Sequence, residues 1–153
     1  YNFDTRYKVL PPLRQQEDNK ALIKGLKNGT IDVITSDHTP IDIENKKLEF
    51  DKALNGIIGL ESMFGLIGEK LSKYLTINEI IEKISNNPRR ILGLDTIKIE
   101  EGCKANITLF NPTFEWVFES KDIKSLSKNT PFLGHKMRGK ALAIINNGKF
   151  MEC

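Results

Sequence analysis

The chain has 153 residues, of which 39% are hydrophobic and 28% charged, and its formal net charge is +3. This balance is typical of a soluble globular domain, and no apolar run approaches the length of a membrane span. The lysines are dispersed and form no basic stripe interleaved with aromatic residues, which argues against nucleic-acid binding. We therefore expect neither a membrane nor a nucleic acid as partner.

The termini and the cysteines suggest a cytoplasmic piece of a longer chain. The sequence starts at Tyr1 instead of Met and has no signal-peptide pattern. Cys103 and Cys153 form neither a disulfide framework nor a metal-ligand spacing, so we expect two unpaired thiols in a reducing cytoplasm.

The first predicted unit is a helix followed by a buried strand. Apolar residues recur on one helical face over residues 17–27, and the Asn-Gly pair at 28–29 supplies a stop. The β-branched residues 31–35 predict a short strand buried on both faces. The polar sequence Ser-Asp-His-Thr-Pro follows at 36–40. Together these segments indicate an α/β unit.

Further helices are predicted in the next fifty residues. Residues 41–52 are polar and predict an exposed loop, and an apolar stripe beginning at Leu60 predicts a second helix. A third helix is predicted from Thr76, which forms a capping-box pattern with Glu79. The sequence Asn-Asn-Pro at 86–88 should end it, because the residue before proline is pushed out of helical geometry.

Past Gly93 the pattern changes to short strands. Residues 107–110, 114–118 and 141–145 predict strands, and the Asn-Gly pair at 147–148 predicts a hairpin. The α/β part has too few strands for a stable parallel sheet, and the β part has too few for a closed sandwich. Each part is therefore expected to belong to something larger.

Asp37 is the first candidate for chemistry, because it directly follows the predicted buried strand. In α/β barrels, catalytic residues and metal ligands project from this end of the strands. A turn residue or a helix N-cap is the alternative explanation for a single aspartate in a polar loop.

Three ordered blocks resemble dihydroorotase and related cyclic amidohydrolases. They read Lys-Val-Leu-Pro-Pro-Leu-Arg (8–14), Gly-Thr-Ile-Asp-Val-Ile-Thr-Ser-Asp-His-Thr-Pro (29–40) and Gly-Ile-Ile-Gly-Leu-Glu (56–61), and a similar tail continues at 87–94, 102–106, 129–132 and 147–149. The resemblance implies an α/β fold in two domains. Residues 1–92 would be the C-terminal part of a TIM-type (β/α)8 metal-dependent hydrolase barrel. Residues 93–153 would be strands of a small β-sandwich domain.

The same resemblance implies a zinc-dependent reaction in pyrimidine biosynthesis, the interconversion of dihydroorotate and N-carbamoyl-aspartate. The aspartate of the family's Ser/Thr-Asp-His motif, here Asp37, would bind zinc and act as general base for a zinc-activated water. Backbone groups at Asn55 and Gly56 would contact the cyclic amide substrate. A loop glycine required for its backbone angles explains Gly56 equally well.

Departures from the family pattern leave other functions open. Leu10 and Ile41 stand where the family has a substrate-binding asparagine and histidine, and Asn55 replaces an aromatic residue. Two lost polar contacts weaken the binding of a charged substrate. The alternatives are another cyclic amidohydrolase such as an allantoinase or hydantoinase, or a catalytically silent homologue that is a structural partner of aspartate transcarbamoylase.

Most of the family's metal ligands lie outside this sequence. They comprise a His-x-His pair, a bridging lysine or aspartate and two further histidines, whereas this chain has only His38 and His135. We expect His38 to support its loop. The remaining zinc ligands are expected from the remainder of the parent chain, so the isolated piece should be inactive, and a homodimer is left open.

Overall fold

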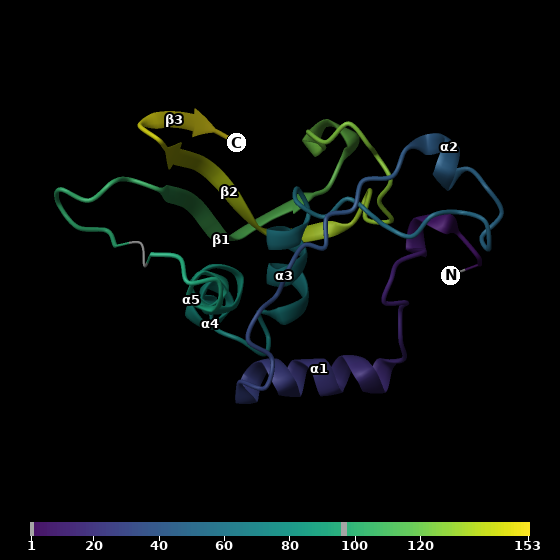
Figure 1. The fold of residues 1–153 in the computed structure, drawn as a ribbon, viewed down its shortest axis with the longest axis horizontal. Helices are drawn as coiled ribbons and strands as arrows, with labels where there is room; N and C mark the ends of the chain where they lie inside the picture. Colours follow the sequence, from purple (N-terminus) through teal and green to yellow (C-terminus); the bar gives the residue numbers. More distant parts are fainter. Residues whose placement is uncertain (1, 96–97) are drawn as a thin grey trace.

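The computed structural model describes residues 2–95 and 98–153. Helices occupy the first part and strands the last, in the order η1 (Thr5–Tyr7), α1 (Gln16–Asn28), α2 (Ile43–Lys46), α3 (Met63–Leu71), α4 (Ile77–Ile81), η2 (Glu82–Asn86), α5 (Asn87–Ile91), β1 (Ile107–Val117), η3 (Ser120–Asp122), β2 (Lys136–Asn146) and β3 (Lys149–Glu152). The strands form one antiparallel sheet in the order β1-β2-β3. Helix α3 lies between this sheet and α1 (Figure 1). Within the described ranges, no helix is long and apolar enough to cross a membrane.

Helix α1 confirms the first predicted helix and its stop. Its first turn is closed by a hydrogen bond from the Gln15 backbone N–H to Asp18 Oδ2 (3.0 Å), and Gly29 ends it with a φ of 79°. Only the C-terminal end of its apolar face is packed, since Leu26 is buried whereas Leu22 is 54% exposed. The sequence pattern therefore predicted the helix correctly, but little of this face is covered within the chain.

Residues 31–35 were predicted as a buried strand, yet they form no ladder with another strand among the described residues. The predicted strand does not form among the described residues, because a strand needs a neighbouring strand and none of the described ones lies beside it. The backbone is instead held by the helical segment that follows α3. Lys83 Nζ donates to Ile31 O (2.6 Å), and Asn87 Nδ2 donates to Asp32 O (2.8 Å).

The helix that starts at Thr76 does not end at the Asn-Asn-Pro sequence, which corrects a second prediction. The capping box is present, but the chain continues through the π-helical η2 into α5. In η2 the Asn87 N–H donates to Glu82 O, five residues back, and the next residue, Pro88, has no N–H. The Lys83 carbonyl is thus left without a helical donor, and it accepts the Ile34 N–H (3.1 Å).

The sheet confirms the predicted strands and hairpin. The segments 107–110 and 114–118 fall largely in one long strand, β1, whose pairing with β2 shifts register twice between residues 109 and 115. Asn147 and Gly148 have positive φ values of 49° and 73° and connect β2 to β3. This backbone geometry is the one that the Asn-Gly pair favours in tight hairpins.

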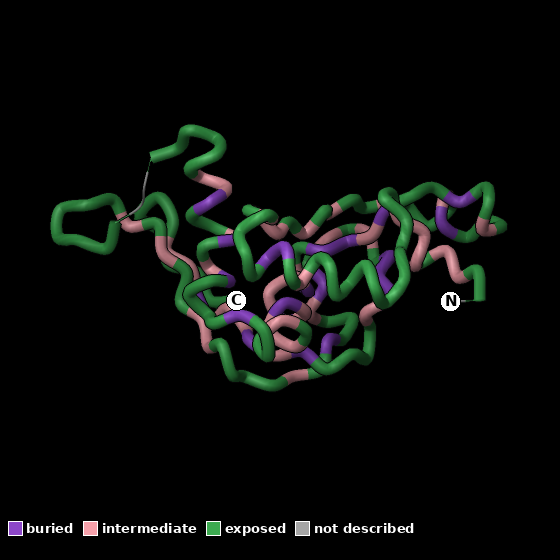
Figure 2. The backbone as a smooth tube through the Cα atoms, turned by 90° about the horizontal axis from the view of Figure 1, so that it is seen from below, coloured by how far each residue is buried: buried purple, intermediate pink, exposed green. Residues whose placement is uncertain are grey.

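Helix α3 and strand β2 approach each other closely through glycines. A Cβ atom added to Gly68 would lie 1.9 Å from Arg138 O, and one added to Gly65 would lie 2.8 Å from Met137 Cβ. Beside this contact, a core cluster is formed by Ile58, Phe118, Ile123 and Met137. Buried residues accordingly gather along the middle of the molecule (Figure 2). The predicted domain boundary at residues 92–93 stays a prediction.

Candidate functional site

Asp37 lies at the end of the segment 31–36, on a backbone bend. Its φ of 44° is in the left-handed region, which aspartate and asparagine enter more readily than most residues. The side chain is exposed, and its carboxylate makes no hydrogen bond or ion pair with any other residue of the described ranges. The carboxylate is therefore free to accept a proton or to bind a cation.

The loop around Asp37 is fixed by contacts with residues 57–60. His38 Nδ1 accepts the backbone N–H groups of Gly59 (3.1 Å) and Leu60 (3.3 Å), and the Thr39 N–H donates to Ile57 O (2.8 Å). These bonds confirm the prediction that His38 supports the loop. Nδ1 is thus the acceptor that joins the Asp37 loop to the backbone of residues 59–60.

Gly56 brings the predicted substrate loop (residues 54–60) against the Asp37 loop (residues 37–41). It is buried with a φ of 137°, and an added Cβ would lie 2.7 Å from Thr39 O. Both of its backbone groups are already used, since its N–H donates to Lys8 O (3.0 Å) and its carbonyl accepts from Asn129 Nδ2 (2.9 Å). The need for glycine here is thus explained by backbone angle and close packing. Asn55, next to it, is exposed.

Lys46 corrects the prediction that residues 41–52 form an exposed loop. The segment contains α2, whose N-cap Asp42 accepts the Asn45 N–H (2.8 Å), and the Lys46 side chain is buried at its end. Lys46 Nζ donates to the carbonyls of Thr5 (2.9 Å), Leu54 (2.9 Å) and Lys8 (3.3 Å). Burial lowers the pKa of Lys46, and the neighbouring Lys8 ammonium lowers it further. The ammonium joins the N-terminal segment to the substrate loop.

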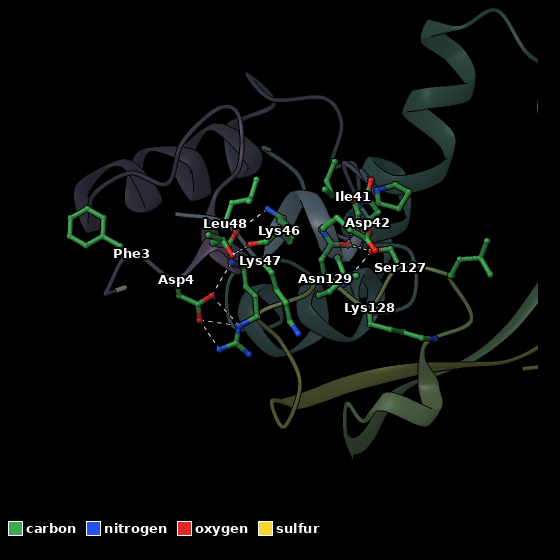
Figure 3. A pocket seen from close by; sticks show the side chains of 16 residues that line it. Phe3, Asp4, Ile41, Asp42, Lys46, Lys47, Leu48, Ser127, Lys128 and Asn129 are labelled. Atoms are coloured by element: carbon green, nitrogen blue, oxygen red, sulfur yellow. Dashed lines mark hydrogen bonds and ion pairs between the residues drawn. The ribbon is translucent and has the colours of Figure 1, made fainter. Parts of the chain in front are cut away.

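Leu10 and Ile41, two of the three positions predicted to depart from the family pattern, lie in separate grooves. Leu10 lines a groove of about 530 Å³ together with Asn55. Ile41 lines a larger groove of about 1120 Å³ between α2, the N-terminal segment and residues 126–129. In Figure 3, Ile41 lies near Ser127 and Asn129, whereas Phe3 and Asp4 lie on the other side of this groove.

Glu61 anchors the loop of the β part that borders the larger groove. Its Oε1 atom accepts the N–H groups of Lys124 (3.2 Å) and Ser125 (2.7 Å) and the Ser125 hydroxyl (2.5 Å). Burial raises the pKa of Glu61, but the Ser125 hydrogen bonds and the nearby His38 outweigh it, so the pKa is lowered from 4.5.

A Glu61→Gln variant should therefore be less stable than the wild type at neutral pH, by about 1 kcal/mol, because hydrogen bonds to a charged acceptor are the stronger ones. A lowered pKa in the folded state stabilises it above the ordinary value of 4.5, and this stabilisation disappears as pH falls through the folded-state pKa. The difference in melting temperature between the two proteins should shrink below pH 4.5. The exposed Glu101→Gln is the control, and an equal effect in it would contradict this role.

A metal centre was expected to need ligands beyond this chain. Among the described residues, no group of three or more His, Cys, Asp or Glu side chains is placed to hold a metal ion. The exposed carboxylate of Asp37, which bonds to no other described residue, could nevertheless be one ligand of a metal ion. Cys103 and Cys153 are free, as predicted, and both are exposed.

Sequence reasoning missed Lys46 and Asn129, which hold the two candidate loops. Both were overlooked because their partners are backbone carbonyls and N–H groups of distant segments, which leave no spacing pattern in the sequence. The only available signal was the position of Asn129 inside a block that resembles the family, whereas Lys46 lies between two such blocks.

Known proteins resemble this chain over nearly its whole length. Residues 11–149 match the amidohydrolase family. Dihydroorotase from Chlorobaculum tepidum is 47% identical over 92% of this chain and 33% of its own length. Dihydroorotase from Geotalea daltonii is 44% identical over 98% of this chain and 36% of its own length. The chain thus spans about a third of these curated relatives.

Solved structures give the same fold. L-hydantoinase (dihydropyrimidinase) from Arthrobacter aurescens has a TM-score of 0.87 at 26% identity, covering 99% of this chain and 35% of that one. A D-hydantoinase structure has a TM-score of 0.82 at 22% identity, covering 97% of this chain and 34% of that one, and this likeness concerns the fold alone. These matches confirm the predicted resemblance and the α/β hydrolase fold, and the chain belongs to the amidohydrolase family.

Proposed function

We propose that the full-length protein containing this chain is a metal-dependent cyclic amidohydrolase that interconverts dihydroorotate and N-carbamoyl-aspartate. The similarity to dihydroorotases over nearly the whole chain supports this substrate. The observation that carries the chemistry is the exposed, unbonded Asp37 carboxylate on a loop fixed by residues 57–60. Such a reaction would place the protein in pyrimidine biosynthesis, in the cytoplasm.

Asp37 has two roles in this proposal. It would be one ligand of a metal ion, zinc in our proposal, while the remaining ligands would come from the rest of the protein. When bound, the ion acidifies the attacking water and polarises the amide carbonyl. The Asp37 carboxylate takes a proton from this water while the water oxygen forms a bond to the carbonyl carbon. It then delivers that proton to the ring nitrogen as the C–N bond breaks, which opens the ring.

Asn55 and Gly56 would form the substrate side of the site. The exposed Asn55 is available for direct contact with the cyclic amide, and Gly56 sets the path of the loop through its tight packing on Thr39. The groove that contains Leu10 is also lined by Asn55, and the groove that contains Ile41 is lined by Asn129, which bonds to Gly56. Their apolar side chains offer a substrate no hydrogen bonds, so substrate binding would depend on backbone groups and on the rest of the protein.

A substrate panel tests the proposed reaction. Full-length protein loaded with zinc should open dihydroorotate with a higher kcat/KM than hydantoin, dihydrouracil or allantoin, and its metal content should be measured in parallel. A preference for another ring would overturn dihydroorotate as the substrate while keeping the reaction class. A protein that takes up no zinc when zinc is supplied, and that opens none of the four rings, would contradict the enzymatic proposal as a whole.

Leu10 and Ile41 favour a second candidate function, a catalytically silent homologue that assembles with aspartate transcarbamoylase. Both residues replace polar groups that would contact the substrate, whereas a free Asp37 carboxylate would be needless in a scaffold. Size-exclusion chromatography of the full-length protein with aspartate transcarbamoylase from the same organism tests this alternative. A stable complex formed by an inactive protein would favour the scaffold, and the same column run reports whether the protein is a homodimer.

A further inference from the structure

We propose that Asn129 is a positioning residue, whose amide group sets the relative position of the Asp37 loop and the substrate loop. This inference rests on the proposed function for its link to catalysis. Asn129 comes from the segment between η3 and β2, far in sequence from either loop, and its side chain is buried. It lines the large groove beside Ile41 and Ser127 (Figure 3).

The Asn129 side chain bonds to both loops at once. Its Nδ2 donates to Gly56 O (2.9 Å), and its Oδ1 accepts the Ile41 N–H (3.3 Å). Its backbone carbonyl accepts the Ile58 N–H (3.1 Å), which adds a second bond to the substrate loop. Asn129 therefore connects Ile41, in the Asp37 loop, to Gly56 and Ile58 in the substrate loop.

Ser127 completes the connection to the Asp37 loop. Its hydroxyl donates to Ile41 O (2.6 Å) and also contacts Asn129 Oδ1. The Ile41 backbone is thus held on both its N–H and its carbonyl by residues of the β part. Movement of this loop relative to Gly56 would break several hydrogen bonds together.

An amide is the side chain that suits this position. It donates from nitrogen and accepts at oxygen on the same rigid plane, so it bridges a carbonyl and an N–H. A carboxylate of the same shape keeps the acceptor, but it loses the donor and faces the Gly56 carbonyl with negative charge. Asn129→Asp therefore removes the bond to the substrate loop and changes the size of the side chain very little.

Asn87 provides a matched control elsewhere in the chain. It is buried like Asn129, and its Nδ2 likewise donates to a backbone carbonyl, that of Asp32 (2.8 Å). Its Oδ1 accepts from Arg90 Nη2 (2.9 Å). Asn87→Asp thus breaks an equivalent buried bond, but on the helical side of the segment 31–35 and away from the substrate loop.

The test compares Asn129→Asp and Asn87→Asp in the full-length protein, at a temperature where both are folded by their melting curves. Asn129→Asp should lower kcat/KM for the substrate about 10- to 100-fold, mostly through a higher KM, because small misplacements of positioning groups have effects of this size. Asn87→Asp should stay close to the wild type in kcat/KM. Unchanged kinetics in Asn129→Asp, or equal losses in both variants, would overturn the proposal.

Hydrogen–deuterium exchange separates this inference from the proposed function. Amides of residues 38–41 and 56–60 should exchange faster in Asn129→Asp than in the wild type, and this difference should be absent in Asn87→Asp. The exchange result decides whether Asn129 couples the loops even if the wild type turns over no cyclic amide. Unchanged exchange at both segments would reject the positioning role.

Discussion

Asp37→Asn in the full-length protein is expected to lower kcat/KM for its cyclic amide by about 10² to 10⁴, the usual contribution of a positioned general base. Asparagine keeps the shape of the side chain and tolerates the φ of 44° at this position, so the loop should be preserved. Alanine is the poorer choice, because it adds backbone strain at this angle to the loss of the carboxylate. Steady-state kinetics and metal content should be measured on the same preparation.

Asp32→Asn is the matched control for this prediction. Asp32 is an exposed aspartate in the same segment, five residues before Asp37, and its backbone carbonyl, not its carboxylate, is bound by Asn87. It should retain full activity and full metal content. Wild-type activity in Asp37→Asn would show that Asp37 takes no part in the reaction. Lost activity with full metal content would support Asp37 as the base and show that the metal does not require it as a ligand.

The largest effect on stability is expected from Gly68→Ala. The added Cβ would lie 1.9 Å from Arg138 O, a backbone atom of β2, so neither helix nor strand can yield by turning a side chain. Overpacking of this kind costs about 1–3 kcal/mol, which exceeds the gain of about 1 kcal/mol from replacing a helical glycine. The melting temperature of the full-length protein should therefore fall.

Gly25→Ala tests whether this loss comes from the backbone contact. Gly25 is also helical and buried, but an added Cβ would meet the Ile31 side chain at 2.9 Å, and a side chain can move. It should be less destabilising than Gly68→Ala. Equal melting temperatures of the two variants would show that the contact between α3 and β2 yields more easily than its geometry indicates.

Local chemistry made parts of the fold predictable. Gly29 ends α1, Thr76 and Glu79 cap α4, and the hairpin at 147–148 follows from residues that tolerate positive φ. In each case the residues that determine the structure are neighbours in sequence, so short patterns are sufficient. The order of the family-like blocks likewise indicates Asp37 as a candidate from the sequence alone.

Features that depend on distant partners could not be predicted in this way. The pattern of residues 31–35 indicates burial on two faces, but pairing requires neighbouring strands that the described chain does not supply. Pro88 was expected to end a helix, and the π-helical turn before it removes the conflict by shifting the hydrogen bonds. The sequence predicts an exposed Lys46, because no residue near it in sequence indicates the three carbonyls around its ammonium.

The surroundings of Lys46 also bear on how the site responds to ionic strength. Its charge is compensated by the dipoles of three carbonyls, and it forms no ion pair with a carboxylate of the described residues. Dissolved ions screen exposed charge pairs, but they cannot enter a buried cage of carbonyl oxygens. Salt will therefore weaken surface pairs such as Lys52 with Glu49 and leave the junction between the N-terminal segment and the substrate loop intact.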